Sequence, residues 1–202
     1  MSTWIITPDK YLNSDQLRAL RNTIETAMLR AKSKGQQIAA RDYTVIEVAL
    51  GTGLRVSELS KLLVADIQLG RGQNSLIVKK GKNNKTRVVI FSSRLKNNIQ
   101  EYLDYRKSAS PYLFFSGRYE QILVSGLQKI FKNYAHKAGF GNMSIHCLRH
   151  TYATRAYIAS GYNLRLVQQQ LGHSSIQTTS VYSAVINPDL EKAMEAMDSQ
   201  EN

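Results

Sequence analysis

The sequence has little cysteine and proline, and it has no long apolar run. Its single cysteine, Cys147, cannot form an internal disulfide, which excludes a secreted scaffold held together by disulfides. Three prolines and 12 glycines are too few for a collagen-like or Pro/Gly-rich disordered chain. No apolar stretch approaches the roughly 18 residues that cross a bilayer, and the first residues lack the charged and apolar regions of a signal peptide. We therefore expect a soluble, cytoplasmic protein without membrane contact.

Acidic residues are also scarce, and they are absent from two long stretches. The chain has 15 Asp plus Glu against 27 Lys plus Arg, which gives a net charge of +12 and a pI near 9.8. Residues 67–100 carry eight basic side chains and no acid, and residues 121–188 carry six and again no acid. A surface that faces a polyphosphate needs such stretches, because carboxylates would repel the phosphates. The charge therefore predicts a nucleic-acid partner; the plainer interpretation is a generally basic protein, such as a ribosome-associated one.

The hydrophobic periodicity predicts a mainly α fold with one small antiparallel β-sheet. A length of 202 residues fits one ordinary domain or two small ones. Asn13 is a candidate N-cap for a first helix that continues to Lys34-Gly35. Residues 76–78 and 88–91 alternate like two strands around a turn at 81–84, and 67–69 is a candidate third strand. Further helices are expected near 39–50, 55–63, 93–106, 122–138, 146–160, 163–171, 175–184 and 190–198.

Several familiar binding motifs are incomplete in this sequence. Gly51-Thr52-Gly53 begins like a dinucleotide loop, but Val56 stands where the third glycine belongs, and Gly81-Lys82 lacks the rest of a phosphate loop. His146 and His150 are spaced for one face of a helix, with His173 or Cys147 as a third zinc ligand. However, no carboxylate lies between Glu120 and Asp189 to support such a site. We expect neither a metal nor a cofactor.

A set of phosphate-directed residues remains. Arg55 begins a short helix, and the Glu58 carboxylate lies one turn later, where it can orient the guanidinium. His146 and Arg149 are three residues apart, hence adjacent on a helix. His173 follows a helix that ends in glycine, and Tyr182 lies nine residues further on.

These segments resemble the tyrosine recombinases of the lambda-integrase and Xer class. The resemblance covers about residues 13–188 and rests on the four motifs Thr52–Leu59, Gly81–Arg87, His146–Thr151 and Leu171–His173 followed by Tyr182, in family order and spacing. It implies a site-specific recombinase or integrase that cleaves and rejoins double-stranded DNA. It also implies the site residues: Arg55, Lys82, His146, Arg149 and His173 activate the phosphate, Tyr182 is the nucleophile, and Glu58 supports the first arginine.

The implied chemistry gives each residue type a reason. Attack by a tyrosine keeps the bond energy in a 3′-phosphotyrosine, so neither ATP nor a metal is needed. Two guanidiniums grip the non-bridging oxygens, where negative charge gathers, and His173 adds a hydrogen bond. His146 is the candidate that takes the tyrosine proton, and Lys82 is the candidate that protonates the 5′-oxygen.

Alternatives stay open for single residues and for the whole chain. Arg55 and Glu58 could form an ordinary surface ion pair, which contributes little. Lys85 could replace Lys82, and His150 is expected to pack or to support a phosphate contact. Cys147 is expected to be a small buried side chain. The rival functions are relaxation of DNA by a type IB topoisomerase, a DNA-binding regulator without activity, and a zinc hydrolase.

The expected organisation has three parts. Residues 1–12 are a short lead-in, in place of the helical core-binding domain that family members usually carry, and 13–188 form the catalytic domain. Residues 189–202 reverse the charge with five acids. Within them, Leu190, Ala193, Met194 and Met197 form one apolar stripe. This acidic helix is expected to pack on its own core or on a neighbouring protomer, in a homo-oligomer that forms a tetramer on paired DNA sites.

Overall fold

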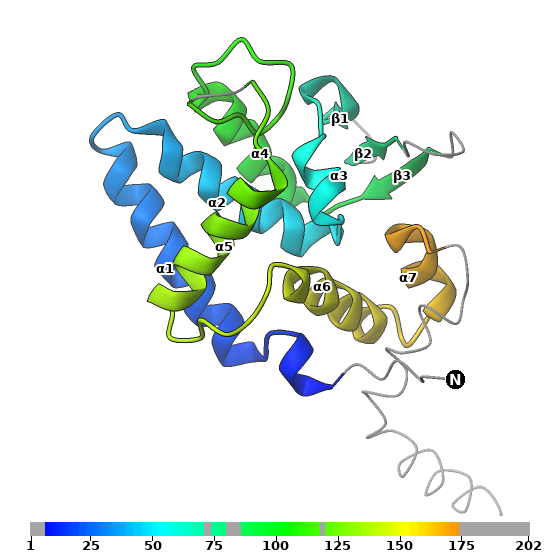
Figure 1. Ribbon diagram of the computed structural model, residues 1–202. Helices are drawn as coiled ribbons and strands as arrows, with labels where there is room; N and C mark the ends of the chain where they lie inside the picture. The colour runs from blue at the N-terminus through cyan, green and yellow to red at the C-terminus, as the bar shows by residue number, and fades with distance from the viewer. Residues whose placement is uncertain (1–6, 71–73, 80–85, 118–119, 174–202) are drawn as a thin grey trace, which may run out of the picture.

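The computed structural model describes residues 7–70, 74–79, 86–117 and 120–173. Seven α-helices and a three-stranded sheet make up this part of the chain (Figure 1), which confirms the mainly α fold with a small antiparallel sheet. The predicted turn at 81–84 and the helices near 175–184 and 190–198 lie outside it. The elements are η1 (Pro8–Lys10), α1 (Ser14–Lys32), α2 (Gln37–Thr52), α3 (Val56–Ser60), η2 (Val64–Asp66), β1 (Ile67–Gln68), β2 (Ser75–Val78), β3 (Arg87–Ile90), α4 (Ser93–Tyr105), α5 (Val124–Lys137), α6 (His146–Ala159) and α7 (Leu164–Leu171).

Helix α1 begins as its sequence predicts. Asn13 caps it with a reciprocal pair of hydrogen bonds: its Oδ1 accepts from the Gln16 backbone N–H at 2.8 Å, and Gln16 Oε1 accepts from the Asn13 N–H at 3.1 Å. Its buried stripe lies on α2. Arg21 adds a two-point ion pair with Glu47 of α2, at 2.8 and 3.1 Å. Glu47 is 4% exposed, so this pair ties the two helices together from inside.

Helix α2 is the central element of the fold. It packs against α1, α4 and α6 (Figure 1). Because it has neighbours on several sides, it buries side chains around most of its circumference, as a core helix does. The buried apolar residues are Ala40, Tyr43, Val45, Ile46, Val48, Ala49 and Leu50. The helix continues through Gly51 and ends at Thr52, two residues beyond its predicted end, with Gly53 as its cap.

The sheet has the order β1-β2-β3, and all its pairs are antiparallel. Leu76 pairs with Val89 and both are fully buried, whereas Val88 on the other face of β3 is exposed. Strand β3 lies beside α7, and the Ile90 backbone N–H donates to Gln170 Oε1 at 3.2 Å. The sheet is therefore joined to the end of the chain that carries His173.

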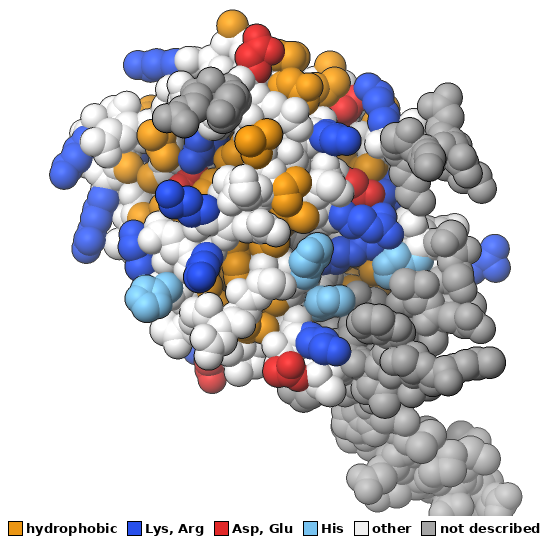
Figure 2. Space-filling view, in the orientation of Figure 1, with side chains coloured by type: hydrophobic (Ala, Val, Ile, Leu, Met, Phe, Trp, Pro, Cys, Tyr) orange, Lys and Arg blue, Asp and Glu red, His pale blue; other side chains and the backbone are white. Residues whose placement is uncertain are grey.

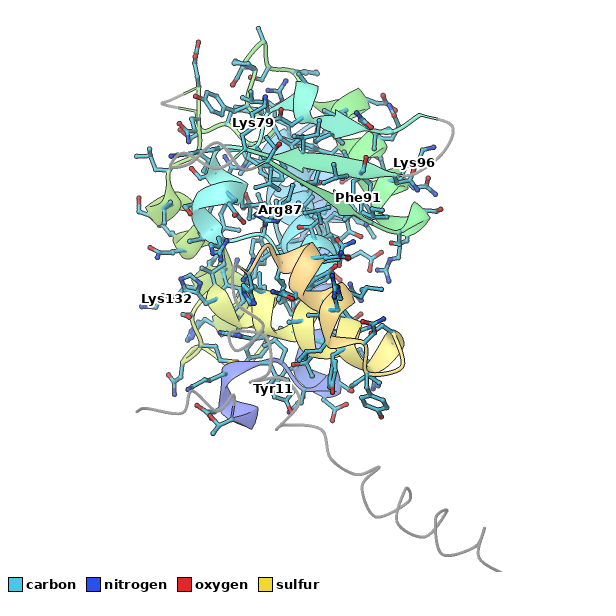
Figure 3. The ribbon with its side chains drawn as sticks, turned by 90° about the vertical axis from the view of Figure 1, so that its right-hand side faces the viewer. Tyr11, Lys79, Arg87, Phe91, Lys96 and Lys132 are labelled. Atoms are coloured by element: carbon cyan, nitrogen blue, oxygen red, sulfur yellow. The ribbon has the colours of Figure 1, made fainter. Side chains whose placement is uncertain are left out.

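The described part of the lead-in packs on α6. The Leu12 backbone N–H donates to Thr151 Oγ1 of α6 at 2.8 Å, and Tyr11 lies beside the same helix (Figure 3). No helix in the described residues is long and apolar enough to span a membrane.

Candidate active site

The candidate site is built where four elements begin or end. Arg55 lies at the N-cap of α3, just after α2 ends, and His146 and Arg149 belong to the first turn of α6. His173 follows α7, which ends at Leu171 with Gly172 as its cap. Figure 2 shows histidine side chains gathered over α6 and the end of α7, with Lys and Arg side chains around them. The fold thus brings together segments that lie more than 100 residues apart in the sequence.

Gly53 allows the turn between α2 and Arg55. Its φ of +62° is left-handed, and a Cβ there would stand 2.3 Å from Tyr152 Cδ1 and 2.8 Å from Leu171 Cδ2. A side chain is therefore excluded both by backbone conformation and by space. The close approach lets the Gly53 carbonyl accept a hydrogen bond from Arg149 Nη1.

Arg149 is buried, with 8% of its surface exposed, whereas His146, three residues before it on the same helix, is exposed. Its Nη2 donates to the Leu171 carbonyl at 3.0 Å and lies 2.8 Å from His173 Nε2. These contacts join the guanidinium to the ends of α2 and α7. A buried charge of this kind is costly unless its donors have acceptors, and two backbone carbonyls and the His173 ring provide acceptors here.

The contact with Arg149 also determines how His173 is protonated. A guanidinium has donors only, so Nε2 of His173 accepts and the proton of the neutral ring sits on Nδ1. Burial, followed by the positive charges around it, that of Arg149 first, lowers the pKa of His173 to about 4. The imidazole is therefore neutral at pH 7, and the hydrogen bond expected from it toward a phosphate would come from Nδ1.

Glu58 holds Arg55 but does not form the surface ion pair that the plain interpretation describes. Arg55 Nη1 donates to Glu58 Oε1 at 3.1 Å, and the Arg55 backbone N–H donates to Oε2 at 2.8 Å. The Glu58 side chain is 11% exposed, whereas that of Arg55 is 39% exposed. Burial raises the pKa of Glu58, but hydrogen bonds from Arg87 and Arg55 and the charges of both arginines outweigh this effect and lower the pKa to about 2. Glu58 is thus a charged anchor behind an exposed guanidinium.

Two further histidines lie on α6. His146 is its exposed first residue, and His150 follows one turn later, half-buried. Burial, followed by the charge of Arg149, lowers the pKa of His150 to about 4, so this ring is neutral at pH 7. Among the described residues, no three His, Cys, Asp or Glu side chains are grouped so that they could hold a metal ion. Cys147 is buried, and burial raises the pKa of its thiol to about 12.

The comparison with known proteins identifies the family. Residues 10–187 match the model of the phage integrase family. The chain belongs to the phage integrase family. It is 36% identical over 176 residues to the tyrosine recombinase XerC of Pelobacter propionicus. The match covers 86% of this chain and 56% of that protein. It is 37% identical over 165 residues to the tyrosine recombinase XerA of Pyrococcus furiosus, covering 80% and 56%. These matches confirm the resemblance to tyrosine recombinases.

A solved structure agrees with this assignment. The XerH site-specific recombinase bound to its difH substrate has a similar fold, with a TM-score of 0.72 and 26% identity. The match covers 92% of this chain and 52% of that chain. The chain therefore spans about half the length of the relatives that it matches.

The family match includes every predicted site residue, but the structure describes only some of them. Arg55 is bonded directly to Glu58, Arg149 contacts His173, and His146 and His150 lie on the same helix as Arg149. Lys82, with its alternative Lys85, and Tyr182 lie outside the described residues. Their assignment stays a prediction.

Sequence reasoning gave no role to Arg87, which the structure places behind Arg55. Its Nη1 and Nη2 donate to the two oxygens of Glu58 at 2.8 and 2.9 Å. One signal was available: Arg87 lies two residues before the buried Val89, hence on the inward face of β3. An arginine on that face needs a buried acid as its partner.

Proposed function

We propose that this chain is the catalytic domain of a site-specific recombinase, which cleaves and rejoins double-stranded DNA through a 3′-phosphotyrosine. The main support is the way Arg149 and Arg55 are held. Arg149 is fixed by two backbone carbonyls and Arg55 by the Glu58 carboxylate, with a neutral His173 beside them. Guanidiniums fixed in advance are suited to the negative charge that develops on a phosphate during transesterification.

The proposed step exchanges one phosphodiester bond for another. The Tyr182 phenol oxygen bonds to the phosphorus as its proton passes to His146. The bond from phosphorus to the 5′-oxygen breaks, and Lys82 protonates that oxygen, leaving a free 5′-hydroxyl. Arg55 and Arg149 bind the non-bridging oxygens, and the Nδ1–H of His173 donates to one of them. Rejoining is the same sequence in reverse, with the 5′-hydroxyl as the nucleophile, so no external energy source is required.

The DNA partner is supported by two independent features. The chain carries a net charge of +12, and residues 121–173 include no acidic side chain. In addition, the similar XerH structure is of a recombinase bound to its difH substrate. We propose that the protein acts on DNA in the cytoplasm and that four copies assemble on two paired sites.

The decisive experiment is covalent capture. The 202-residue chain is mixed with a pool of duplexes of random sequence that are nicked near the centre of one strand. Cleavage next to the nick releases a short fragment with a 5′-hydroxyl, so rejoining fails and the adduct survives denaturing electrophoresis. We expect an adduct from a restricted set of sequences, and none from Tyr182→Phe, which should still bind the recovered duplexes.

Other results would point elsewhere. Relaxation of supercoiled plasmids without sequence preference would favour a topoisomerase. Binding without any adduct would favour a DNA-binding regulator. An undiminished adduct with Tyr182→Phe would refute the assignment of the nucleophile.

The proposed assembly has its own test. The chain without residues 189–202 loses five acids and one lysine, so binding to a single site should stay intact or become slightly stronger. If the apolar stripe of that segment docks on a neighbouring protomer, the two-site complex should no longer form in gel-shift experiments. Normal two-site complexes with the truncated chain would leave this segment as a local part of its own protomer.

A further inference from the structure

Arg87 lies at the start of β3 and contacts two other segments of the candidate site. Through Nη1 and Nη2 it binds both oxygens of Glu58, the residue that holds Arg55. Through Nε it donates to the Gln170 carbonyl in the last turn of α7, at 3.2 Å. Figure 3 shows Arg87 between the sheet and that helix. Its side chain and that of Glu58 are each only 11% exposed, so this is an interior connection.

We propose that Arg87 is a positioning residue for strand cleavage, which keeps the Arg55 guanidinium and the His173 imidazole in place around one phosphate. The inference rests on the proposed recombinase function and adds to it a residue that contacts no DNA.

The first argument is the sharing of the Glu58 carboxylate. Oε1 accepts from Nη1 of both arginines, and Oε2 accepts from Nη2 of Arg87 and from the Arg55 backbone N–H. The four acceptor positions of the carboxylate are thus all used. Without Arg87, two of them would open and the whole negative charge would face Arg55. The Arg55 guanidinium would then close onto Glu58 as a two-point pair, in competition with the phosphate.

The second argument concerns the end of α7. The last carbonyls of a helix lack partners within the helix and carry partial negative charge, so cations there are favourable. Arg87 binds the carbonyl of Gln170, and Arg149 binds that of Leu171. Gly172 has a φ of +64°, and a Cβ on it would stand 2.6 Å from Arg87 Cδ. Arg87 therefore packs directly under the residue that precedes His173, and its loss would remove one of the two arginines that bind the last carbonyls of α7.

The test uses the duplex recovered by covalent capture. Arg87→Ala should slow adduct formation at saturating DNA about 10- to 100-fold, the scale of a small misplacement of reacting groups. The Kd for the duplex should stay nearly unchanged, because Arg87 lies in the interior. Arg87→Lys, which keeps the charge but not the two-point geometry, should be intermediate. Guanidinium chloride at non-denaturing concentrations should restore part of the Arg87→Ala rate, whereas sodium chloride should not.

Arg21→Ala is the matched control. It breaks a similar two-point arginine–glutamate pair between α1 and α2, so it should lower the unfolding temperature without slowing adduct formation by the folded fraction. If Arg87→Ala is unstable, Arg87→Lys supplies the rate comparison. The double variant Arg87→Ala/Glu58→Gln should lose less than the product of the two single losses, because both residues act through one network.

Each outcome bears on the proposal. It is overturned if Arg87→Ala and Arg87→Lys form the adduct at the unaltered rate, or if they lose activity only in proportion to their unfolded fraction, as a purely structural residue would. Adduct formation by the unaltered chain distinguishes a failure of the recombinase function from a failure of the inference about Arg87. If it forms an adduct, the recombinase function stands whatever Arg87 does; if it forms none, the proposed function falls and this inference falls with it.

Discussion

Replacing Gly53 with alanine is expected to destabilise the fold in two separable ways. A side chain at a φ of +62° costs about 1 to 2 kcal/mol, because its Cβ crowds the backbone. The new Cβ also lies 2.3 Å from Tyr152 Cδ1 and 2.8 Å from Leu171 Cδ2, so packed side chains must shift. Such overpacking costs about 1 to 3 kcal/mol. The sum is a loss of about 2 to 5 kcal/mol in the free energy of unfolding.

Gly35 offers a matched control for this substitution. Its φ is +68°, close to that of Gly53, but nothing lies within 4 Å of the position of its Cβ. Gly35→Ala should therefore cost only the backbone part, about 1 to 2 kcal/mol. The difference between the two variants, about 1 to 3 kcal/mol, isolates the clash with Tyr152 and Leu171.

Urea unfolding of the three proteins measures these values. In thermal unfolding, each kcal/mol corresponds to about 2 to 4 °C for a chain of this length. Because the Gly53 carbonyl holds Arg149, Gly53→Ala should also slow DNA cleavage at a temperature where the variant is folded. Equal destabilisation by Gly53→Ala and Gly35→Ala would refute the packing argument, and a normal cleavage rate would refute the link to Arg149.

Much of the fold was predictable because its signals are local. The Asn13 cap and the apolar spacing that follows it predict α1, and the structure confirms both. The strands near 76–78 and 88–91 and the short strand before them are also confirmed. These predictions need only neighbouring residues, whose spacing reveals which face is buried.

Helix α3 shows where local signals fail. It was predicted near 55–63, yet it ends at Ser60. The chain leaves the helix because its backbone pairs with a distant loop: Leu113 N–H donates to the Leu62 carbonyl, and Val64 N–H donates to the Pro111 carbonyl. No sequence pattern within 55–63 predicts a backbone hydrogen-bond partner about fifty residues away.

In the candidate site too, the sequence predicts the charged residues but not their burial or protonation. The types and spacing of Arg55, Arg149 and His173 were readable, but the burial of Arg149 and the proton position on His173 depend on tertiary contacts. Arg87 was readable as an inward-facing residue of its strand. Its partners, Glu58 and Gln170, lie 29 and 83 residues away and could not be chosen from the sequence.

Three further predictions concern single side chains of the site. Glu58→Gln should lower the free energy of unfolding at pH 7 by about 3 kcal/mol, because the folded pKa of about 2 lies below the ordinary 4.5. Because the pKa of Glu58 is lowered, its charged form stabilises the folded state above pH 4.5, and this stabilisation is lost as the pH falls from 4.5 toward 2. The difference in unfolding free energy between Glu58→Gln and the unaltered chain should therefore shrink over that range. Urea unfolding at several pH values measures this difference, and a difference that does not change with pH would contradict the role of the Glu58 charge. Arg149→Lys loses the planar fork that reaches Gly53 and Leu171, so adduct formation should fall about 10²- to 10³-fold, while gel-shift binding changes little; near-normal cleavage would make Arg149 an ordinary phosphate contact. Lys82→Ala should be slow on ordinary DNA and largely recover on DNA with a bridging sulfur in place of the 5′-oxygen, because a thiolate leaves without a proton. Recovery by sulfur in Lys85→Ala and not in Lys82→Ala would transfer the role of proton donor to Lys85.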